Sequence, residues 1–357
     1  MKKILRKTLS FIFALLLVLS GTSLFSCKKY YYVTYNAVLF DANLSVVTTE
    51  RKLDGEVINK IDEIVYSLSK EFSLNGNGFL SRINSAEVGE SVALPPIAKE
   101  LLERIFFAAN ISDKFNPTVL PFLKLWHFTE DTAVKNEDFI PPTIEEIDGV
   151  KSTYYFNPSA VKISEDGAYA VKTENVNLEV GAIVKGFATD LIYSVLKTVG
   201  INSGYISFGD SSIAFLDSHT ISVTHPENTR EKILKVGLSK NAFVSTSGTY
   251  RTYYEKDGVK YSHIIDAETG SPTESGALSA VVISDKGYLS DAMSTAFMLL
   301  SVDEAKALIK KMSGDSSFGD FSVFVIYNKD GKKTVLTNEK QGDFTLLDGS
   351  FSVVNPD

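Results

Sequence analysis

The segment Ser290–Ala296 holds a carboxylate and a hydroxyl at helical spacing. Asp291 and Thr295 are four residues apart, so both side chains lie on one face of a helix. Together with backbone carbonyls they make an all-oxygen ligand set, which a hard cation such as Mg²⁺ prefers. The pattern indicates a candidate divalent-cation site. The alternative is an ordinary helix start with Ser290 as its N-cap.

The segment Glu179–Asp190 carries two glycines at an expected turn from a strand to a helix. Gly181 and Gly186 let the backbone approach a ligand, and free amides at a helix start suit a phosphate. Lys185 adds a cation for the same anion. The spacing matches neither a Walker loop nor a dinucleotide fingerprint, so on its own the segment favours a helix entry with a solvated lysine.

The hydroxyl-rich segment Ser245–Arg251 precedes a histidine. Its hydroxyls, glycine and arginine supply donors of the kind that bind a pyrophosphate. His263 has Asp266 three residues further on, which would orient or charge the ring and give a general base near neutral pH. A histidine on a strand is more often structural. The four histidines of the chain lack the spacing of a zinc site.

Aromatic residues close the segment Phe115–Phe128. A proline-containing turn precedes the run Leu125–Phe128, whose rings could stack on a planar ligand such as a flavin or an adenine. The alternative is that Trp126 and Phe128 belong to the hydrophobic core.

Apolar periodicity predicts the helices that position these segments. One helix is expected from Asp54, its N-cap, through Leu68, and a second from Pro95–Pro96 to about Asn110. The glycine turn feeds a helix that Gly200 stops. Two more helices are expected over Ser290–Leu300 and Val302–Met312.

Alternating segments predict the strands. They are Val33–Thr48 with a break at Asp41–Asn43, short strands within Tyr154–Leu178, Tyr205–Phe208, Ile213–Leu216, Ile221–Thr224, Lys232–Leu238, Ala280–Ser284, and a hairpin of Val323–Tyr327 with Thr334–Leu336. Asp257-Gly258 predicts another hairpin, between Thr252–Lys256 and Val259–Ile265. Because strands and helices interleave without strict βαβ order, we expect an α+β fold with mixed or antiparallel sheets.

The N-terminus is typical of an export signal. A basic start is followed by the apolar run Phe11–Leu19, which is too short to span a bilayer because a spanning helix needs roughly 20 residues. Residues 1–26 are therefore expected to be a cleaved signal peptide. Cys27 is the only cysteine, so no disulfide is expected to stabilise the chain.

The end of the signal also bears on location. The stretch Leu24–Cys27 resembles the lipobox of bacterial lipoproteins, in which the cysteine is acylated; the alternative is an ordinary thiol. Residues 27–32 would then be a lipidated tether and 33–357 one compact catalytic unit. An exported protein held on the periplasmic or extracytoplasmic face of a membrane is expected.

Net charge argues against a nucleic-acid partner. The chain carries −8, and residues 1–26 hold four basic and no acidic residues, so the remainder carries −12. An acidic chain without a basic stripe does not neutralise phosphates along a nucleic acid.

Taken together and in this order, the four segments resemble the ApbE family of FAD:protein FMN transferases across nearly the whole chain after the signal. The family motif F-D-P-T-V-x-P-L-x-x-L-W-x-F matches Phe115–Phe128, with Asn116 for the aspartate. D-L-G-G-I-A-K-G-Y-A-x-D matches Glu179–Asp190, S-T-S-G-x-Y matches Ser245–Tyr250, and H-x-I-D-P-x-T-G-x-P matches His263–Pro272. A-D-A-x-S-T-A matches Ser290–Ala296, and S-R-L-N matches Ser81–Asn84.

The resemblance implies roles for these residues. Mg²⁺ would be held by the backbone carbonyl of Ala182 and by Asp291 and Thr295, with Ser294 nearby. His263 would be the base that deprotonates a threonine of a partner protein, whose oxygen attacks the FMN-side phosphate of FAD while AMP leaves. The implied FAD contacts are Phe40, Trp126, His127, Phe128, Glu179, Lys185 and Ile265. Ser247 and Gly248 lie in the segment expected to bind the pyrophosphate.

Three departures from the family pattern leave the implied metal site and base intact. Phe40-Asp41-Ala42 replaces M-G-T, and Leu74 stands where many relatives have tyrosine. Glu179 and Gly181-Ala182 replace an aspartate and a glycine pair, so the acid is kept but is one carbon longer.

The resemblance implies a relatedness to the T-fold and acceptors such as subunits of sodium-pumping or electron-transport complexes on the same membrane face. Two alternatives remain. One is a Mg²⁺-dependent FAD pyrophosphatase that uses water in place of threonine. The other is a flavin-binding lipoprotein without chemistry, for which neither His263 nor Asp291 would be needed.

Overall fold

The computed structural model describes residues 31–33, 38–40, 42–49 and 51–356. The expected signal peptide and Cys27 lie outside the described residues. Within them, no helix is both long and apolar enough to cross a membrane.

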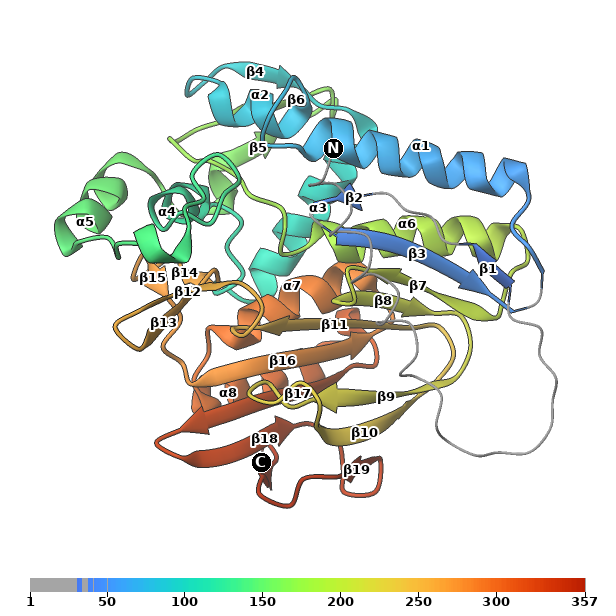
Figure 1. Cartoon of the computed structure of the whole chain (residues 1–357). Helices are drawn as coiled ribbons and strands as arrows, with labels where there is room; N and C mark the ends of the chain where they lie inside the picture. Colours follow the sequence, from blue (N-terminus) through green and yellow to red (C-terminus); the bar gives the residue numbers. More distant parts are fainter. Residues whose placement is uncertain (1–30, 34–37, 41, 50, 357) are drawn as a thin grey trace, which may run out of the picture.

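A ten-stranded sheet forms the centre of the molecule (Figure 1). Its order is β1 (Tyr31–Val33), β3 (Ala42–Thr48), β7 (Gly204–Phe208), β8 (Ser212–Phe215), β11 (Ala242–Gly248), β16 (Ala277–Ser284), β17 (Ser322–Lys329), β18 (Lys332–Thr337) and β20 (Ser352–Val354), with β2 (Val38–Leu39) on β3. The pairs are antiparallel except the last, β18 with β20. The sheet is therefore mixed, as expected.

Both faces of this sheet are buried. Side chains on a strand alternate between its two faces, so neighbouring residues of one strand belong to different clusters. On β16, Ala280 and Val282 belong to one hydrophobic cluster and Val281 and Ile283 to another. On β17, Phe324 packs on the same side as Val281. The sheet is thus the middle layer of the molecule.

Helices cover one face of the sheet. They are α1 (Gly55–Phe72), α2 (Phe79–Ser85), α3 (Pro96–Ile111), α6 (Val184–Thr198), α7 (Gly287–Met298) and α8 (Val302–Ser313). A three-stranded sheet of β9 (His219–Thr224), β10 (Lys232–Leu238) and β19 (Phe344–Leu346) packs on the other face. Another small sheet joins β4 (Ser91–Ala93), β5 (Val161–Ile163) and β6 (Tyr169–Lys172).

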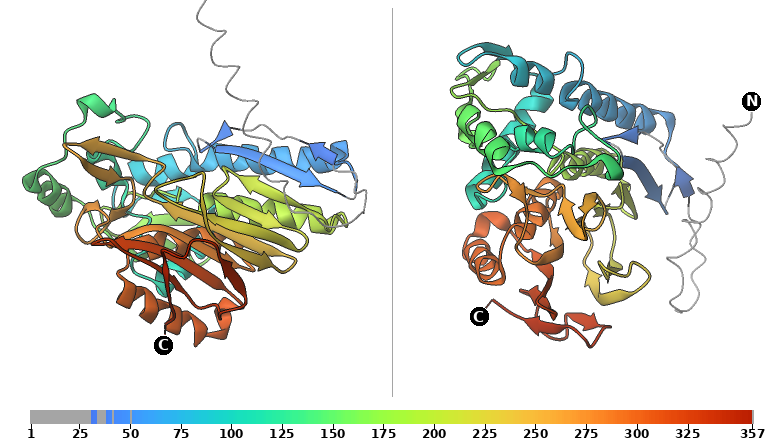
Figure 2. Two further views of the ribbon diagram at one scale, coloured as in Figure 1. Left: turned by 60° about the horizontal axis from the view of Figure 1, so that its bottom comes forward. Right: turned by 60° about the vertical axis from the view of Figure 1, so that its left-hand side comes forward.

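A lobe with its own aromatic core stands at one end of the main sheet (Figure 2). It contains α4 (Leu120–Leu125), η1 (Asn136–Asp138), α5 (Ile144–Thr153), β12 (Tyr253–Lys256), β13 (Val259–Ser262), β14 (Ile265–Asp266) and β15 (Ser271–Pro272); the remaining short helices are η2 (Pro158–Ala160) and η3 (Ser316–Phe318). Phe139 stacks on Tyr254 with 4.3 Å between ring centroids, which joins the loop after η1 to the β12–β13 hairpin. We call this part, including residues 129–148, the aromatic lobe.

Most sequence expectations for the helices hold. Asp54 caps α1 by accepting the Val57 amide at 3.0 Å, and α3 begins at Pro96. Gly200, with φ +76°, follows the end of α6 in a backbone conformation that favours glycine. The Asp257-Gly258 hairpin is present, but β13 ends at Ser262, so His263 and Ile264 lie between strands.

Candidate active site

The site is built where α6 and α7 cross. Their backbones come so close at Gly186 and Gly287 that a Cβ on Gly186 would lie 2.1 Å from the Gly287 carbonyl oxygen. A Cβ on Gly287 would lie 2.4 Å from the Gly186 carbonyl oxygen. Only glycine fits at both positions, and the contact brings the glycine turn against the helix that carries Asp291.

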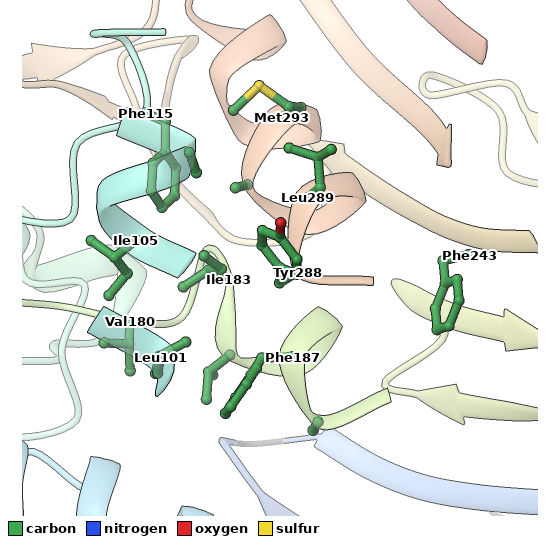
Figure 3. Close-up of a cluster of buried hydrophobic side chains, with 14 of the residues drawn as sticks. Leu101, Ile105, Phe115, Val180, Ile183, Phe187, Phe243, Tyr288, Leu289 and Met293 are labelled. Atoms are coloured by element: carbon green, nitrogen blue, oxygen red, sulfur yellow. The ribbon is translucent and has the colours of Figure 1, made fainter. Parts of the chain in front are cut away.

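Hydrophobic packing holds this crossing in place. Ile183 and Phe187 at the start of α6 lie near Tyr288 and Leu289 of α7, and Leu101 and Ile105 of α3 lie on the other side of Ile183 (Figure 3). All six are buried in the same cluster. Each would cost about 2–5 kcal/mol if truncated to alanine, so the relative position of the two helices is well determined.

The N-terminus of α7 differs from the sequence expectation. The helix begins at Gly287, and Ser290 is fully buried inside it with its hydroxyl donated to the Phe243 carbonyl. Asp190 of α6 provides the cap instead: its carboxylate accepts the amides of Gly287 at 2.6 Å and Tyr288 at 2.8 Å. Burial raises the pKa of Asp190 to about 7, although the two amides act in the opposite direction. Ser290 is therefore not the N-cap.

Asp291 is a buried carboxylate held by donors from two other elements. One oxygen accepts the Gly186 amide at 2.9 Å and the other accepts the Ser212 hydroxyl of β8 at 3.1 Å. The side chain of Asp291 is only 5% exposed. Among the described residues, no lysine, arginine or histidine pairs with these oxygens, so the carboxylate is suited to serve as a ligand of a cation.

Hydroxyls from β11 and α7 gather beside Asp291. Ser247 is 2.8 Å from the Ser294 hydroxyl and 3.1 Å from that of Thr295. Ser294 is fully buried and donates its own proton to the Asp291 carbonyl at 2.8 Å, whereas Thr295 is partly exposed. Thr295 is thus the hydroxyl of α7 that remains accessible to a ligand.

This donor set fits Mg²⁺. It consists of one carboxylate and neighbouring hydroxyls, all oxygen, next to the turn that contains the Ala182 carbonyl. Across the described part of the chain, no three histidine, cysteine or carboxylate side chains converge on a metal position. A site with a single carboxylate leaves room for phosphate oxygens to complete the coordination of a Mg²⁺ ion.

The glycine turn is fixed by its own acid and lysine. Glu179 accepts the Gly181 amide at 2.6 Å, and Lys185 donates to the Gly181 carbonyl at 2.6 Å. Burial raises the pKa of the Glu179 carboxyl, against the lowering effect of the Gly181 amide and the Lys185 charge. The turn is therefore held in a preformed shape before any ligand arrives.

Asn84, within the S-R-I-N segment, ties the segment before the turn to α2; this segment is not the strand that the sequence predicted, because the last strand before α6 is β6. Its side chain accepts the Leu178 amide at 2.7 Å and donates to the Leu178 carbonyl at 2.8 Å. The buried Lys172 donates to the Asn84 carbonyl at 3.2 Å. Next to Leu178, the Glu179 amide donates to the Pro117 carbonyl at 2.6 Å, so the segment is pinned on two sides.

His263 is held through its Nδ1 atom, and Nε2 has no hydrogen-bond partner among the residues that the structure describes. Its Nδ1 lies 3.1 Å from the Thr252 carbonyl oxygen. Because a carbonyl only accepts, Nδ1 carries the proton, and in the neutral ring Nε2 then keeps its lone pair. Burial lowers the pKa of His263 below its usual 6.5, with Lys185 acting in the same direction. Asp266, expected to orient it, is instead paired with Lys114 at 2.9 Å.

The aromatic segment lies partly in the core of the aromatic lobe. Trp126 is 4% exposed and donates its indole N–H to the Gly270 carbonyl at 2.8 Å. Phe128 meets His263 edge to face with 6.3 Å between centroids. His127 adopts φ +62° and accepts the Tyr254 hydroxyl at its carbonyl. Phe128 is thus the member of this segment that lies beside the candidate base.

Three other expected FAD contacts are also positioned by the fold. Phe40 has φ +51° and packs, half-buried, against the main core. Ile265 is buried in the aromatic lobe. Gly248 ends β11, and a Cβ there would lie 2.5 Å from the Tyr250 ring. These contacts and the metal ligands stay predictions.

Sequence reasoning missed Ser212, Gly287 and Asp190 as parts of the site. The last residue of the D-L-G-G-I-A-K-G-Y-A-x-D match is Asp190, and its terminal place in a site motif was the available signal. For Ser212 there was none, since a serine at the start of a strand is ordinary.

The fold and site define an α+β protein in which a glycine turn, one buried carboxylate and several hydroxyls form a site suited to a phosphorylated ligand with a hard cation. A model of the ApbE family matches residues 33–317. The chain therefore belongs to the ApbE family.

Curated proteins similar to this chain include FAD:protein FMN transferases. The FAD:protein FMN transferase of Treponema pallidum (strain Nichols) is 26% identical over 279 residues, covering 73% of this chain and 76% of the relative. That of Escherichia coli (strain K12) is 25% identical over 246 residues, covering 65% and 67%. The expectation of a transferase of this family is confirmed.

Solved structures confirm the fold. The crystal structure of the ApbE protein from Thermotoga maritima has a TM-score of 0.71 at 23% identity, covering 84% of this chain and 94% of that one. The apo form of the flavinyl transferase ApbE of Pseudomonas stutzeri has a TM-score of 0.68 at 23% identity, covering 83% and 90%.

Proposed function

We propose that this chain transfers the FMN half of FAD to a threonine hydroxyl of acceptor proteins and releases AMP, in a reaction that requires Mg²⁺. The observation that carries the proposal is the Asp291 carboxylate, held by Gly186 of the glycine turn at 2.9 Å beside the Ser247 and Thr295 hydroxyls. This arrangement joins a phosphate-binding turn to an oxygen ligand set.

Asp291 and Thr295, with the Ala182 carbonyl, would hold the cation. When bound, Mg²⁺ would neutralise charge on the diphosphate of FAD. The glycine turn and Lys185 bind and orient the same diphosphate from the helix start. The aromatic lobe supplies rings at which the flavin would stack, with Phe128 beside His263.

His263 acts on the acceptor. Its free Nε2 takes the proton of the threonine hydroxyl, and the oxygen forms a bond to the FMN-side phosphorus. The bond between that phosphorus and the bridging oxygen breaks, and the electron pair leaves with AMP. The product is FMN joined to the acceptor by a phosphoester bond. Fixed geometry from the Thr252 carbonyl lowers the entropy cost of this step.

The decisive experiment incubates the chain from residue 31, which keeps β1, with FAD, Mg²⁺ and an acceptor domain, followed by mass spectrometry of the acceptor. We expect an added mass of FMN on a threonine and one AMP per label. Release of AMP without the adduct would replace the transferase with a FAD pyrophosphatase. FAD binding with neither product would leave a flavin carrier.

We also propose that the protein is exported and anchored by acyl chains on Cys27, with residues 27–30 as the tether that leads into β1, so that it meets acceptors on the outer side of the membrane. The support is the N-terminal sequence: a basic start, a short apolar run and the only cysteine of the chain. Cys27→Ser should leave the mature protein in the soluble fraction. Membrane recovery equal to that of the parent would remove the anchor.

A further inference from the structure

The described chain begins at one end of the main sheet. Strand β1 pairs with β3 so that Tyr31 lies opposite Thr48, the last residue of β3. The neighbouring Thr49 is hydrogen-bonded to Ser203, whose hydroxyl donates to Asp217. These contacts place Tyr31, the first described residue, on a defined surface.

We name this surface the distal edge. It consists of Arg51, Lys52, Lys197, Asp217, His219 and Lys240. Arg51 donates to the Val199 carbonyl at the end of α6, and Asp217 pairs with His219 at 2.8 Å. Lys240 precedes the start of β11, where Ala242 lies opposite Phe215, two residues before Asp217.

Two elements run from the active site to the distal edge. Helix α6 begins after the glycine turn and ends at Thr198; its 15 residues span about 22 Å. Strand β3 begins at Ala42, close to Gly209, whose carbonyl accepts from Arg251. It ends at Thr48 after seven residues, or about 23 Å. The start of β1 and the active site therefore lie at opposite ends of both elements.

Charge differs between the two ends. The part of the aromatic lobe over residues 129–148 carries seven acidic residues and one lysine, and all seven acids are exposed. The distal edge carries one arginine and three lysines. Its Asp217 accepts a hydrogen bond from Ser203 and pairs with His219. Figure 1 and the left view of Figure 2 show the aromatic lobe at the far end from β1.

We propose that the distal edge faces an anionic lipid surface and that the active site faces away from the membrane. The inference rests on the anchor at Cys27 proposed above. Four peptide units separate Cys27 from Tyr31, which limits the tether to about 14 Å. Lysine and arginine side chains near a bilayer are attracted by anionic headgroups, whereas the acidic residues of the aromatic lobe are repelled.

This orientation selects the acceptor. With α6 along the membrane normal, the site stands about 22 Å above the headgroups. A membrane-embedded acceptor must therefore carry its threonine on a domain or loop that projects from the bilayer. A threonine at the headgroup level would not reach His263.

The test uses the lipidated full chain in vesicles of phosphatidylethanolamine and phosphatidylglycerol that contain a headgroup-attached nitroxide lipid. Because acylated Cys27 is the only native cysteine, one introduced cysteine carries the fluorophore. Ser218→Cys reports on the distal edge and Glu145→Cys on the aromatic lobe; both side chains are exposed. We expect nitroxide quenching several-fold stronger at position 218 than at 145.

Two results would overturn the proposal and are distinguishable. If the protein fails to float with vesicles, the proposed anchor and the proposed orientation are both refuted. If it floats but quenching is equal at the two positions, or stronger at position 145, only the orientation is refuted. FMN transfer to a soluble acceptor domain, measured on the same samples, reports separately on the catalytic function.

A charge swap tests the role of the basic residues. Lys52→Glu with Lys240→Glu should reduce the difference in quenching between the two probe positions. Lys310→Glu with Lys332→Glu changes net charge equally on exposed residues elsewhere and should not. An equal loss in both double variants would exclude a specific contact of the distal edge with the lipid surface.

Discussion

The buried carboxylate of Asp291 is proposed to bind a cation, and it also accepts hydrogen bonds from the Gly186 amide and the Ser212 hydroxyl. Asp291→Asn keeps the volume but turns one oxygen into an NH₂ group that opposes a donor and ligates no cation. We expect transfer to fall about 100-fold or more, with a smaller loss of FAD binding by fluorescence titration. The exposed Asp285→Asn is the matched control; full activity of Asp291→Asn with Mg²⁺ would exclude the metal role.

The histidine gives a pH dependence with a definite sign. Since the pKa of His263 is lowered from 6.5, more than half of the rings are neutral and basic at pH 6.5. We expect kcat/KM for transfer to fall on the acid side with a midpoint below pH 6.5. His263→Ala should keep FAD bound and lose transfer together with this acid limb. An acid limb above pH 6.5 would argue against His263 as the base.

Among the elements, the crossing of α6 and α7 depends on glycine. Gly186→Ala places a methyl group 2.1 Å from a backbone oxygen of α7, so the helices must separate. Overpacking of this kind costs about 1–3 kcal/mol, and it moves Asp291 away from the turn. We expect a lower melting temperature and lost transfer.

Gly149→Ala in α5 is the control, because nothing lies within 4 Å of its added Cβ. Alanine in a helix interior is more favourable than glycine by about 1 kcal/mol. Gly149→Ala should match or exceed the parent in stability. A Gly186→Ala variant as stable and active as Gly149→Ala would contradict the close contact.

Because Asp190 caps α7, the stability of the protein is expected to depend on pH. Because the pKa of Asp190 is raised from 3.8 to about 7, the folded state holds a proton there that the unfolded chain has released. The stabilisation is complete below pH 3.8 and is lost as pH rises toward 7. Asp190→Asn should flatten the decline in melting temperature over this range for the ligand-free protein. An unchanged slope would exclude Asp190 as its source.

Local sequence patterns predicted which helices and strands exist, but they did not predict which of these elements contact one another. The apolar periodicity after Asp54 and the Asp257-Gly258 turn gave α1 and the β12–β13 hairpin, because both signals are contained in a few neighbouring residues. The start of α7 was missed, since its cap comes from Asp190, 97 residues earlier than Gly287. Motif order indicated the same site residues, but only the fold shows that Ser212 donates to Asp291.

For the whole molecule, the stretch beyond the family match completes the sheet. The family model ends at residue 317, yet β17 begins at Ser322 and pairs with β16, the strand that leads into α7. Val323 and Val325 pack on the helical side while Phe324 and Ile326 pack on the opposite side. Removing β17 would expose both cores at once.

Truncation separates the contributions of the last strands. A chain ending at residue 317 should fail to fold, because burying four large apolar side chains contributes about 6–12 kcal/mol and a domain is stable by only 5–15 kcal/mol. A chain ending at residue 339 keeps β17 and β18 and loses β19 and β20, which are short edge strands. It should unfold cooperatively at a lower temperature by circular dichroism and still bind FAD. Cooperative unfolding of the shorter chain with bound FAD would show that the catalytic unit ends before β17.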